Sequence, residues 1–280
     1  MADGTCADDF APLRDLLDTC LADGDDAGAS IALVHDGELL VDLWGGEARP
    51  GVPWTRDTLV QVWSVTKTMV GLAVLVLADR GELDLDAPVA SYWPDFAAAG
   101  KGDVRVCQVL GHTSGVPGWT PPITVEDLID LERSEALLAA EAPWYEPGSA
   151  PAYQLIDHGH LLDAIVRGAT GRPLADVLHE DVVAPLGGGF HLGVPEDLLD
   201  DCADLIAPPR LELDPDHPPT DFLVRTILNP GLSTRTCNSA AWRRSAVGGA
   251  GGHGTARGVA QVQAVVSHGG EVGGTRLLSP

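Results

Sequence analysis

Two kinds of hydrophobic pattern follow one another at the start of the chain. Residues 10–21 place apolar side chains at helical spacing with aspartates on the opposite face, which predicts an amphipathic helix. Two apolar runs follow, at 30–35 and 38–44, and only Asp36-Gly37 separates them. An Asp-Gly pair suits a type I′ turn, which needs a positive φ at both central residues. We therefore expect a helix followed by an antiparallel hairpin.

The segment from Ser64 to Arg80 has no polar face over its middle part. Residues 69–78 are all apolar or glycine, which indicates a helix that is buried all round. Gly81 is placed to end this helix as the first residue beyond its C-cap. The apolar stretch is roughly half as long as a membrane span requires, so we expect no membrane segment here.

The rest of the chain shows weaker patterns. Helical spacing recurs at 125–141, 155–170, 173–185 and 254–268. His253 and His268 flank the last of these and are interpreted as helix-end residues. The stretch 187–230 is rich in Pro and Asp with little periodicity, which predicts an irregular excursion over the surface. Neither a repeat nor a low-complexity linker is visible, so a single domain is expected.

Charge and cysteine usage exclude several classes of function. The chain carries 17 basic and 41 acidic residues, a net charge of −24, which argues against binding to nucleic acid or to an anionic membrane surface. The five cysteines are scattered and form no C-x-x-C pair, so neither a disulfide scaffold nor a zinc ribbon is indicated. The N-terminus lacks the features of a secretory signal, and a cytoplasmic location is expected.

The main chemical candidate is Ser64-Val65-Thr66-Lys67. A serine and a lysine three residues apart at a helix start lie on one face, where a neutral amine can take the serine proton. Holding the amine neutral at pH 7 requires a pKa shift of about 3 units, which burial could provide. The chain has only two lysines, Lys67 and Lys101, and arginine could not act as this base. The alternative is that Ser64 is a plain N-cap and Lys67 an exposed residue.

Later motifs occur in the order and spacing of a known group of proteins: residues 81–89, 110–115, 144–153, 170–173 and 185–187. With the Ser-x-x-Lys pair, they make the chain resemble the serine β-lactamase and penicillin-binding superfamily. The likeness is greatest to its class C-like branch, which includes the family VIII carboxylesterases. It implies an α/β (α+β), β-lactamase/transpeptidase-like fold. One domain, 1–280, would set a helical lobe (about 58–230) against an antiparallel sheet lobe (about 1–57 and 231–280).

The resemblance also implies roles for three residues. Ser64 matches the acylated nucleophile, Lys67 the proton-handling lysine, and Tyr153 the tyrosine of the second motif, whose phenol shares a proton with the lysine. The alternative for Tyr153 is a core tyrosine bound to backbone. No metal or organic cofactor is implied, since nucleophile and base are side chains. His158 and His160 lie two apart on a predicted helix and make a poor metal pair.

The chain departs from the superfamily pattern in two ways. Where β-lactamases have Tyr-x-Asn, with Asn binding the lactam amide, this chain has Tyr153-Gln154-Leu155, and it has no Lys-Thr-Gly motif. Superfamily members are also longer, and Ser279-Pro280 is typical of a helix start. We therefore expect a C-terminally truncated hydrolase whose sheet lacks strands. It would keep the Ser64 amide as one oxyanion donor and lack the other.

Three functions remain open at this point. The first is a cytoplasmic serine esterase that cleaves a small-molecule ester through an acyl-enzyme on Ser64, with Lys67 and Tyr153 moving protons. The second keeps the superfamily but makes the protein a β-lactamase or D,D-peptidase. The third is a non-catalytic fragment or binding module. The acyl and alcohol parts of a substrate, and the oligomeric state, cannot be read from the residues.

Overall fold

A computed structural model of the chain describes residues 1–208 and 220–280. Its N-terminal part is the helix α1 (Ala11–Asp23) and a sheet of β1 (Asp3–Cys6), β2 (Gly28–His35), β3 (Glu38–Arg49) and β4 (Val52–Pro53). The strand order is β1-β3-β2, β4 pairs with β3, and all pairs are antiparallel. Asp36 and Gly37 have φ values of 48° and 78°, as a type I′ turn requires, so the predicted helix and hairpin are confirmed.

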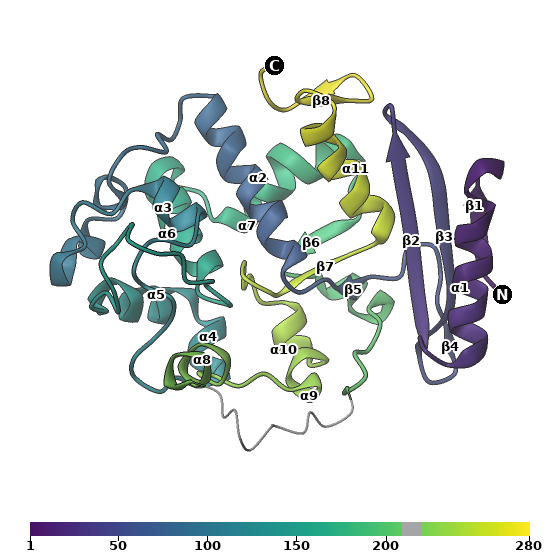
Figure 1. Cartoon of the computed structure of the whole chain (residues 1–280), viewed down its shortest axis with the longest axis horizontal. Helices are drawn as coiled ribbons and strands as arrows, with labels where there is room; N and C mark the ends of the chain where they lie inside the picture. Colours follow the sequence, from purple (N-terminus) through teal and green to yellow (C-terminus); the bar gives the residue numbers. More distant parts are fainter. Residues whose placement is uncertain (209–219) are drawn as a thin grey trace.

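This sheet is the middle layer of three. Figure 1 shows it between α1 on one side and α11 (Ala256–Ser267) on the other. Leu17 of α1 packs on Val41 and Leu43 of β3, and all three side chains are buried. The predicted helix at 254–268 is therefore confirmed as α11, and it joins the sheet to the rest of the molecule.

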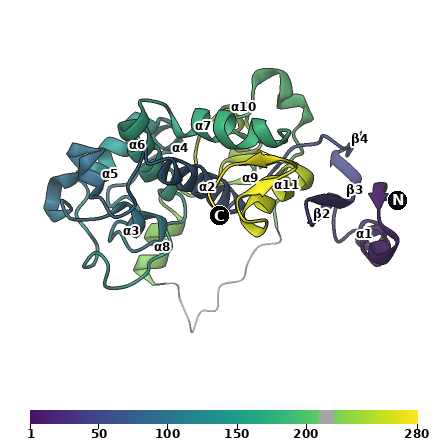
Figure 2. The same cartoon turned by 90° about the horizontal axis from the view of Figure 1, so that it is seen from above.

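The helix α2 (Val65–Asp79) lies at the centre of the fold. Figure 2 shows it between α11 and a group of helices on the other side. Gly81 follows with φ 72°, the left-handed conformation expected beyond a C-cap. Most of α2 is buried, but Val65 and Leu75 are each 40% exposed. The prediction that α2 is buried on all faces is thus wrong for the face that carries Val65 and Leu75. The other faces of the helix pack on the core.

The helices beyond α2 are α3 (Val106–Leu110), α4 (Val125–Ile129), α5 (Leu131–Ala140), α6 (His158–Thr170) and α7 (Leu174–Val177). After α7 the chain continues as a π-helix, η4 (Leu178–Val183), and a 3-10 turn, η5 (Ala184–Leu186). Further 3-10 turns are η1 (Asp8–Phe10), η2 (Val89–Ser91), η3 (Pro94–Gly100) and η6 (Glu196–Asp201). The single helix predicted at 125–141 is two helices, because Asp130 leaves helical geometry and its carboxylate caps α5 by accepting from Arg133 N.

A second, smaller sheet lies against the start of α2. Its strands are β5 (Val60–Gln61), β7 (Gly252–Gly254) and β6 (Phe190–Leu192), in the order β5-β7-β6 and antiparallel. His253 therefore belongs to a strand, and its prediction as a helix-end residue is wrong. The stretch 187–230, predicted to be irregular, contains the strand β6, so that prediction is wrong for residues 190–192. Residues 209–219 of the stretch lie outside the described residues. Strands of two or three residues are too short to produce a detectable alternation.

The remaining elements are short. They are α8 (Asp221–Ile227), α9 (Thr234–Cys237), α10 (Ala240–Arg243) and a final hairpin of β8 (Glu271–Val272) and β9 (Thr275–Arg276). His268 caps α11 and directs its Nδ1 to the Ala264 carbonyl at 2.9 Å, as a helix-end residue does. Among helices in the described residues, none combines the length and the apolar character needed to cross a bilayer.

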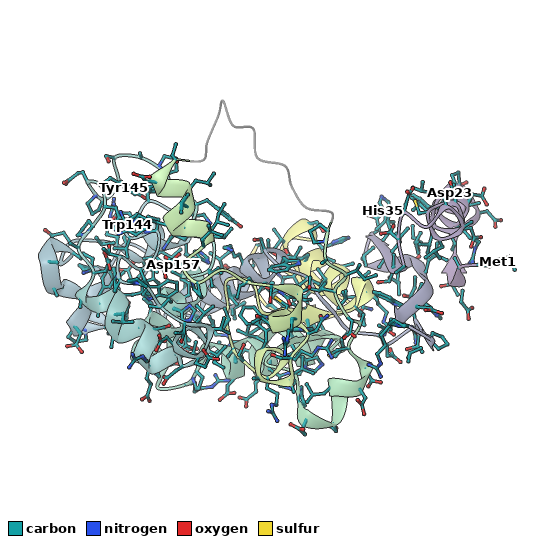
Figure 3. The ribbon with its side chains drawn as sticks, turned by 90° about the horizontal axis from the view of Figure 1, so that it is seen from below. Met1, Asp23, His35, Trp144, Tyr145 and Asp157 are labelled. Atoms are coloured by element: carbon teal, nitrogen blue, oxygen red, sulfur yellow. The ribbon has the colours of Figure 1, made fainter. Side chains whose placement is uncertain are left out.

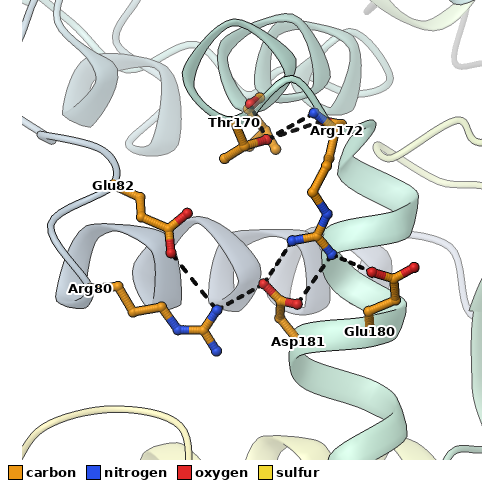
Figure 4. Close-up of polar contacts among 7 residues, drawn as sticks. Arg80, Glu82, Thr170, Arg172, Glu180 and Asp181 are labelled. Atoms are coloured by element: carbon orange, nitrogen blue, oxygen red, sulfur yellow. Dashed lines mark hydrogen bonds and ion pairs between the residues drawn. The ribbon is translucent and has the colours of Figure 1, made fainter.

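An ion-pair network joins the C-terminal end of α2 to η4 (Figure 4). Asp181 accepts from Arg80 at 2.8 Å and from Arg172 at 3.1 Å, and Arg172 also reaches Glu180 at 2.7 Å. Such partly exposed pairs each contribute well under about 1 kcal/mol. They connect η4 to the C-terminal end of α2, whereas Ser64 lies at the N-terminal end of that helix.

Candidate active site

Ser64 and Lys67 meet at the N-terminal end of α2. Ser64 is the N-cap residue with φ −70° and ψ −7°, and within the described structure its hydroxyl makes no capping hydrogen bond. The Lys67 side chain is buried, at 8% exposure, and its Nζ lies 3.4 Å from Ser64 Oγ. The alternative of a plain N-cap beside an exposed lysine is therefore not what the structure shows.

The start of α2 is held against β7. Val62 N donates to the Gly252 carbonyl at 2.9 Å, and Gly252 N donates in return to Thr66 Oγ1 at 3.0 Å. Trp63, directly before Ser64, has φ 47°, a left-handed conformation that non-glycine residues rarely adopt. The turn into the helix is thus sharp and anchored on both sides of Ser64.

Two backbone carbonyls orient the Lys67 amine. Nζ donates to Leu155 O and to Gly249 O, both at 2.7 Å. Burial lowers the pKa of Lys67 below its ordinary value, while the Tyr153 phenol and the Asp157 carboxyl act in the opposite direction. A lysine that takes a proton from serine needs a lowered pKa, so this shift agrees with the role that the sequence analysis gives to Lys67.

Tyr153 joins this pair from a loop. The Lys67 Nζ lies 4.8 Å from the centroid of the Tyr153 ring. The Tyr153 side chain is 48% exposed, which does not fit the alternative of a core tyrosine. The structure thus brings together all three residues that the sequence analysis selects.

Sequence reasoning missed Asp157 and assigned no chemistry to His112. The Asp157 carboxylate accepts from Gln154 Nε2 at 3.0 Å, and burial raises the pKa of Asp157 to about 7. His112 lies beside Tyr153, with ring centroids 4.7 Å apart. Figure 3 places Asp157 in the interior and Trp144 and Tyr145 nearer α8. No local pattern could have identified these groups, because loops far apart in sequence bring them together.

The two histidines of α6 have separate surroundings. The His158 ring lies 4.6 Å from that of His112, whereas His160 bonds to the Leu128 carbonyl at 2.9 Å and contacts Trp119 edge-on. They point to different faces of α6, as the spacing predicts. In residues 1–208 and 220–280, no three His, Cys, Asp or Glu side chains are grouped to hold a metal ion.

Comparisons with known proteins agree with this geometry. The family model described as Beta-lactamase matches residues 13–279. The esterase/beta-lactamase LipL of Mycobacterium tuberculosis is 34% identical over 90% of this chain and 61% of its own length. The esterase EstB of Burkholderia gladioli is 35% identical over 63% of this chain and 50% of its own length. The chain therefore spans only part of the length of these curated relatives.

Solved structures show the same fold over the whole chain. A family VIII carboxylesterase superposes with a TM-score of 0.92 at 38% identity, covering 100% of this chain and 75% of that one. A penicillin-binding protein homologue from Caulobacter crescentus gives 0.91 at 34% identity, with the same coverage. The predicted β-lactamase/transpeptidase-like fold and the predicted resemblance to the serine β-lactamase and penicillin-binding superfamily are both confirmed. From its fold and from the family match over nearly its full length, the chain belongs to the beta-lactamase family.

Proposed function

We propose that this chain carries the active site of a serine hydrolase that cleaves carboxylic esters of small molecules through an acyl-enzyme on Ser64. The observation that carries the proposal is the buried Lys67 amine 3.4 Å from a serine hydroxyl that is not used as a helix cap. The names of the relatives LipL and EstB, both esterases, support the same class of reaction.

The placement of the amine suits proton abstraction. A neutral amine has two N–H groups and one lone pair. Leu155 O and Gly249 O can accept the two N–H groups, and Ser64 Oγ lies 3.4 Å from Nζ, so we assign the lone pair to the side of the Ser64 hydroxyl. The lone pair can then take the hydroxyl proton while Oγ bonds to the ester carbonyl carbon. The protonated Lys67 amine then gives this proton to the leaving oxygen as the ester C–O bond breaks, so the alcohol departs and the acyl-enzyme remains. Water hydrolyses the acyl-enzyme and releases the acid.

Tyr153 is the second proton-transfer group in this proposal. Its ring lies beside Nζ, and its partial exposure gives the phenol access to a bound ester. We assign one oxyanion donor to the Ser64 amide, at the positive end of α2.

The test is covalent labelling combined with turnover. A fluorophosphonate should add to the wild-type chain once, and peptide mapping should place the adduct on Ser64. Ser64→Ala should lose both the adduct and the hydrolysis of a short-chain aryl ester. Lys67→Met should lower kcat by about 10²–10⁴-fold, the range typical of a lost general base.

Lys101→Met is the matched control, because Lys101 is the other buried lysine and its amine also donates to main-chain carbonyls. Its activity per folded molecule should equal that of the wild type. Absence of labelling in wild type, or labelling that survives Ser64→Ala, contradicts the proposal and favours a binding module.

β-Lactam hydrolysis is the second candidate, because the relative LipL is named both esterase and beta-lactamase. Against it, the Leu155 side chain packs on the hydrophobic core and offers no amide at the position that follows Tyr153-Gln154. We expect aryl esters to be cleaved faster than a chromogenic cephalosporin. Leu155→Asn should raise the ratio of cephalosporin to ester turnover. Faster cephalosporin hydrolysis by the wild type would reverse the ranking.

A further inference from the structure

Tyr153 has little regular structure to hold it. It lies in a segment without helix or strand that runs up to α6 at His158, and its side chain is 48% exposed. A phenol that moves a proton to or from Lys67 must nevertheless stay within hydrogen-bond reach of the reacting atoms. Some part of the protein therefore has to determine where this segment lies.

His112 contacts three consecutive residues of that segment. The His112 carbonyl accepts from Ala152 N at 2.8 Å, and His112 Nδ1 accepts from Gln154 N at 3.2 Å. The His112 ring packs on the ring of Tyr153 itself, with centroids 4.7 Å apart and an angle of 49°. One residue thus binds the backbone on both sides of Tyr153 and also contacts its side chain.

His112 is well suited to hold a neighbour in place because it is itself anchored. It follows α3, whose Val106 and Val109 are fully buried, and His112 N donates to the Val109 carbonyl at 3.1 Å. Its ring also lies 4.6 Å from the ring of His158, which is 2% exposed. Its φ of 58° is left-handed, a conformation that costs about 1 kcal/mol or more and persists only where surrounding contacts impose it.

The hydrogen bond to Gln154 also determines the tautomer of His112. A backbone N–H can only donate, so Nδ1 must be unprotonated and the neutral ring carries its proton on Nε2. A doubly protonated ring would have no acceptor for Gln154 N. Burial lowers the pKa of His112, which favours the neutral form that this contact needs.

We propose that His112 is a positioning residue for Tyr153, which holds the phenol beside Lys67 through the backbone of residues 152–154. The proposal rests on the proposed function insofar as Tyr153 is a proton-transfer group. Among the described residues, His112 makes no hydrogen bond to Ser64 or Lys67. We therefore expect it to act on the reaction through Tyr153.

Two substitutions separate the contributions of His112. His112→Gly removes the ring and its Nδ1 acceptor without placing a Cβ at positive φ, and it keeps the carbonyl that accepts from Ala152 N. His112→Asn restores a short side-chain acceptor in a residue that tolerates this conformation. For aryl-ester hydrolysis we expect His112→Gly to lower kcat by up to about 10²-fold, as an ångström-scale misplacement can. KM should change less than about 3-fold, since the substrate itself is not contacted. His112→Asn should recover a large part of kcat.

A double-mutant cycle tests whether His112 acts through Tyr153. In a Tyr153→Phe background, His112→Gly should cause no further loss of kcat, because the group that it positions is already absent. An equal fold-loss in both backgrounds would overturn the proposal. The proposal would also be overturned if His112→Gly lost total activity only because less protein folds. In that case kcat per folded molecule would be unchanged, and His112→Asn would recover nothing.

Hydrogen exchange provides a readout that does not need turnover. In His112→Gly the amide of Gln154, which loses its acceptor, should exchange at least 10-fold faster than in wild type. The amide of Ala152, whose carbonyl acceptor stays, should change less, while amides in α6 and α11 stay protected. Unchanged exchange at residues 152–154 would show that His112 does not hold this segment. Failure of Ser64 labelling, by contrast, would refute the proposed function and leave the exchange result valid.

Discussion

Gly159 sits where α6 approaches the loop that supplies one of the Lys67 acceptors. A Cβ at Gly159 would lie 2.2 Å from the carbonyl carbon of Gly248 and 2.4 Å from the nitrogen of Gly249. Ordinary contacts begin at 3.4 Å, so the Gly248–Gly249 peptide must move by roughly 1 Å to admit a methyl group. Gly249 O accepts from Lys67 Nζ at 2.7 Å, and the same movement would lengthen that bond past hydrogen-bond range.

The expected loss for Gly159→Ala follows from two terms. Overpacking of this size costs about 1–3 kcal/mol, and loss of a hydrogen bond from a buried amine costs about 1.5–3 kcal/mol more. We therefore expect the free energy of unfolding to fall by about 2.5–6 kcal/mol, the sum of the two terms. A misdirected amine should also lower kcat by about 10–10²-fold in the molecules that remain folded. Urea denaturation and aryl-ester hydrolysis per folded molecule measure the two effects.

Two other glycines provide matched controls. Gly168 lies nearer the other end of α6, roughly 13 Å further along the helix, where a Cβ would meet the Tyr92 carbonyl oxygen at 1.9 Å. Gly168→Ala should lose stability while kcat stays near the wild-type value. Gly71 of α2 has no described atom within 4 Å of such a Cβ, so Gly71→Ala should gain up to about 1 kcal/mol. Wild-type stability and kcat in Gly159→Ala would refute the reasoning.

Two further predictions concern buried charge outside the site. Burial, and then the charge of Asp163, raise the pKa of Glu135 from 4.5 to about 8, so the folded state holds a proton that the unfolded chain releases. The free energy of unfolding should therefore fall as pH rises from about 5 to about 8. Urea midpoints measured across this range should depend less on pH in Glu135→Gln than in the wild type. The same pH dependence in both proteins would contradict the raised pKa of Glu135. Lys101→Met should cost about 3 kcal/mol or more in unfolding free energy by thermal or urea denaturation, because it strands the carbonyls of Ala98, Ala139 and Glu141. An unchanged midpoint would show that these carbonyls do not depend on the amine.

Local structure was largely predictable from local spacing. The first helix, the Asp36-Gly37 hairpin and the central helix each follow from residues that are neighbours in the chain, and all three are present. The Ser64–Lys67 pair belongs to the same class, because one helical turn brings the two side chains together without help from elsewhere. Two of the errors fall on very short strands, β6 and β7, where pairing with distant strands rather than pattern decides the structure.

The sequence by itself therefore determined the first helix, the hairpin and the central helix, the family likeness and which three side chains to examine. Tertiary structure alone decided what surrounds them. The carbonyls that orient Lys67 come from 88 and 182 residues away, and a backbone carbonyl carries no residue-specific pattern that could reveal it. His112 and Asp157 were likewise hidden, since their roles depend on burial and on the meeting of loops. Packing over long sequence distances creates these environments, and no local spacing encodes them.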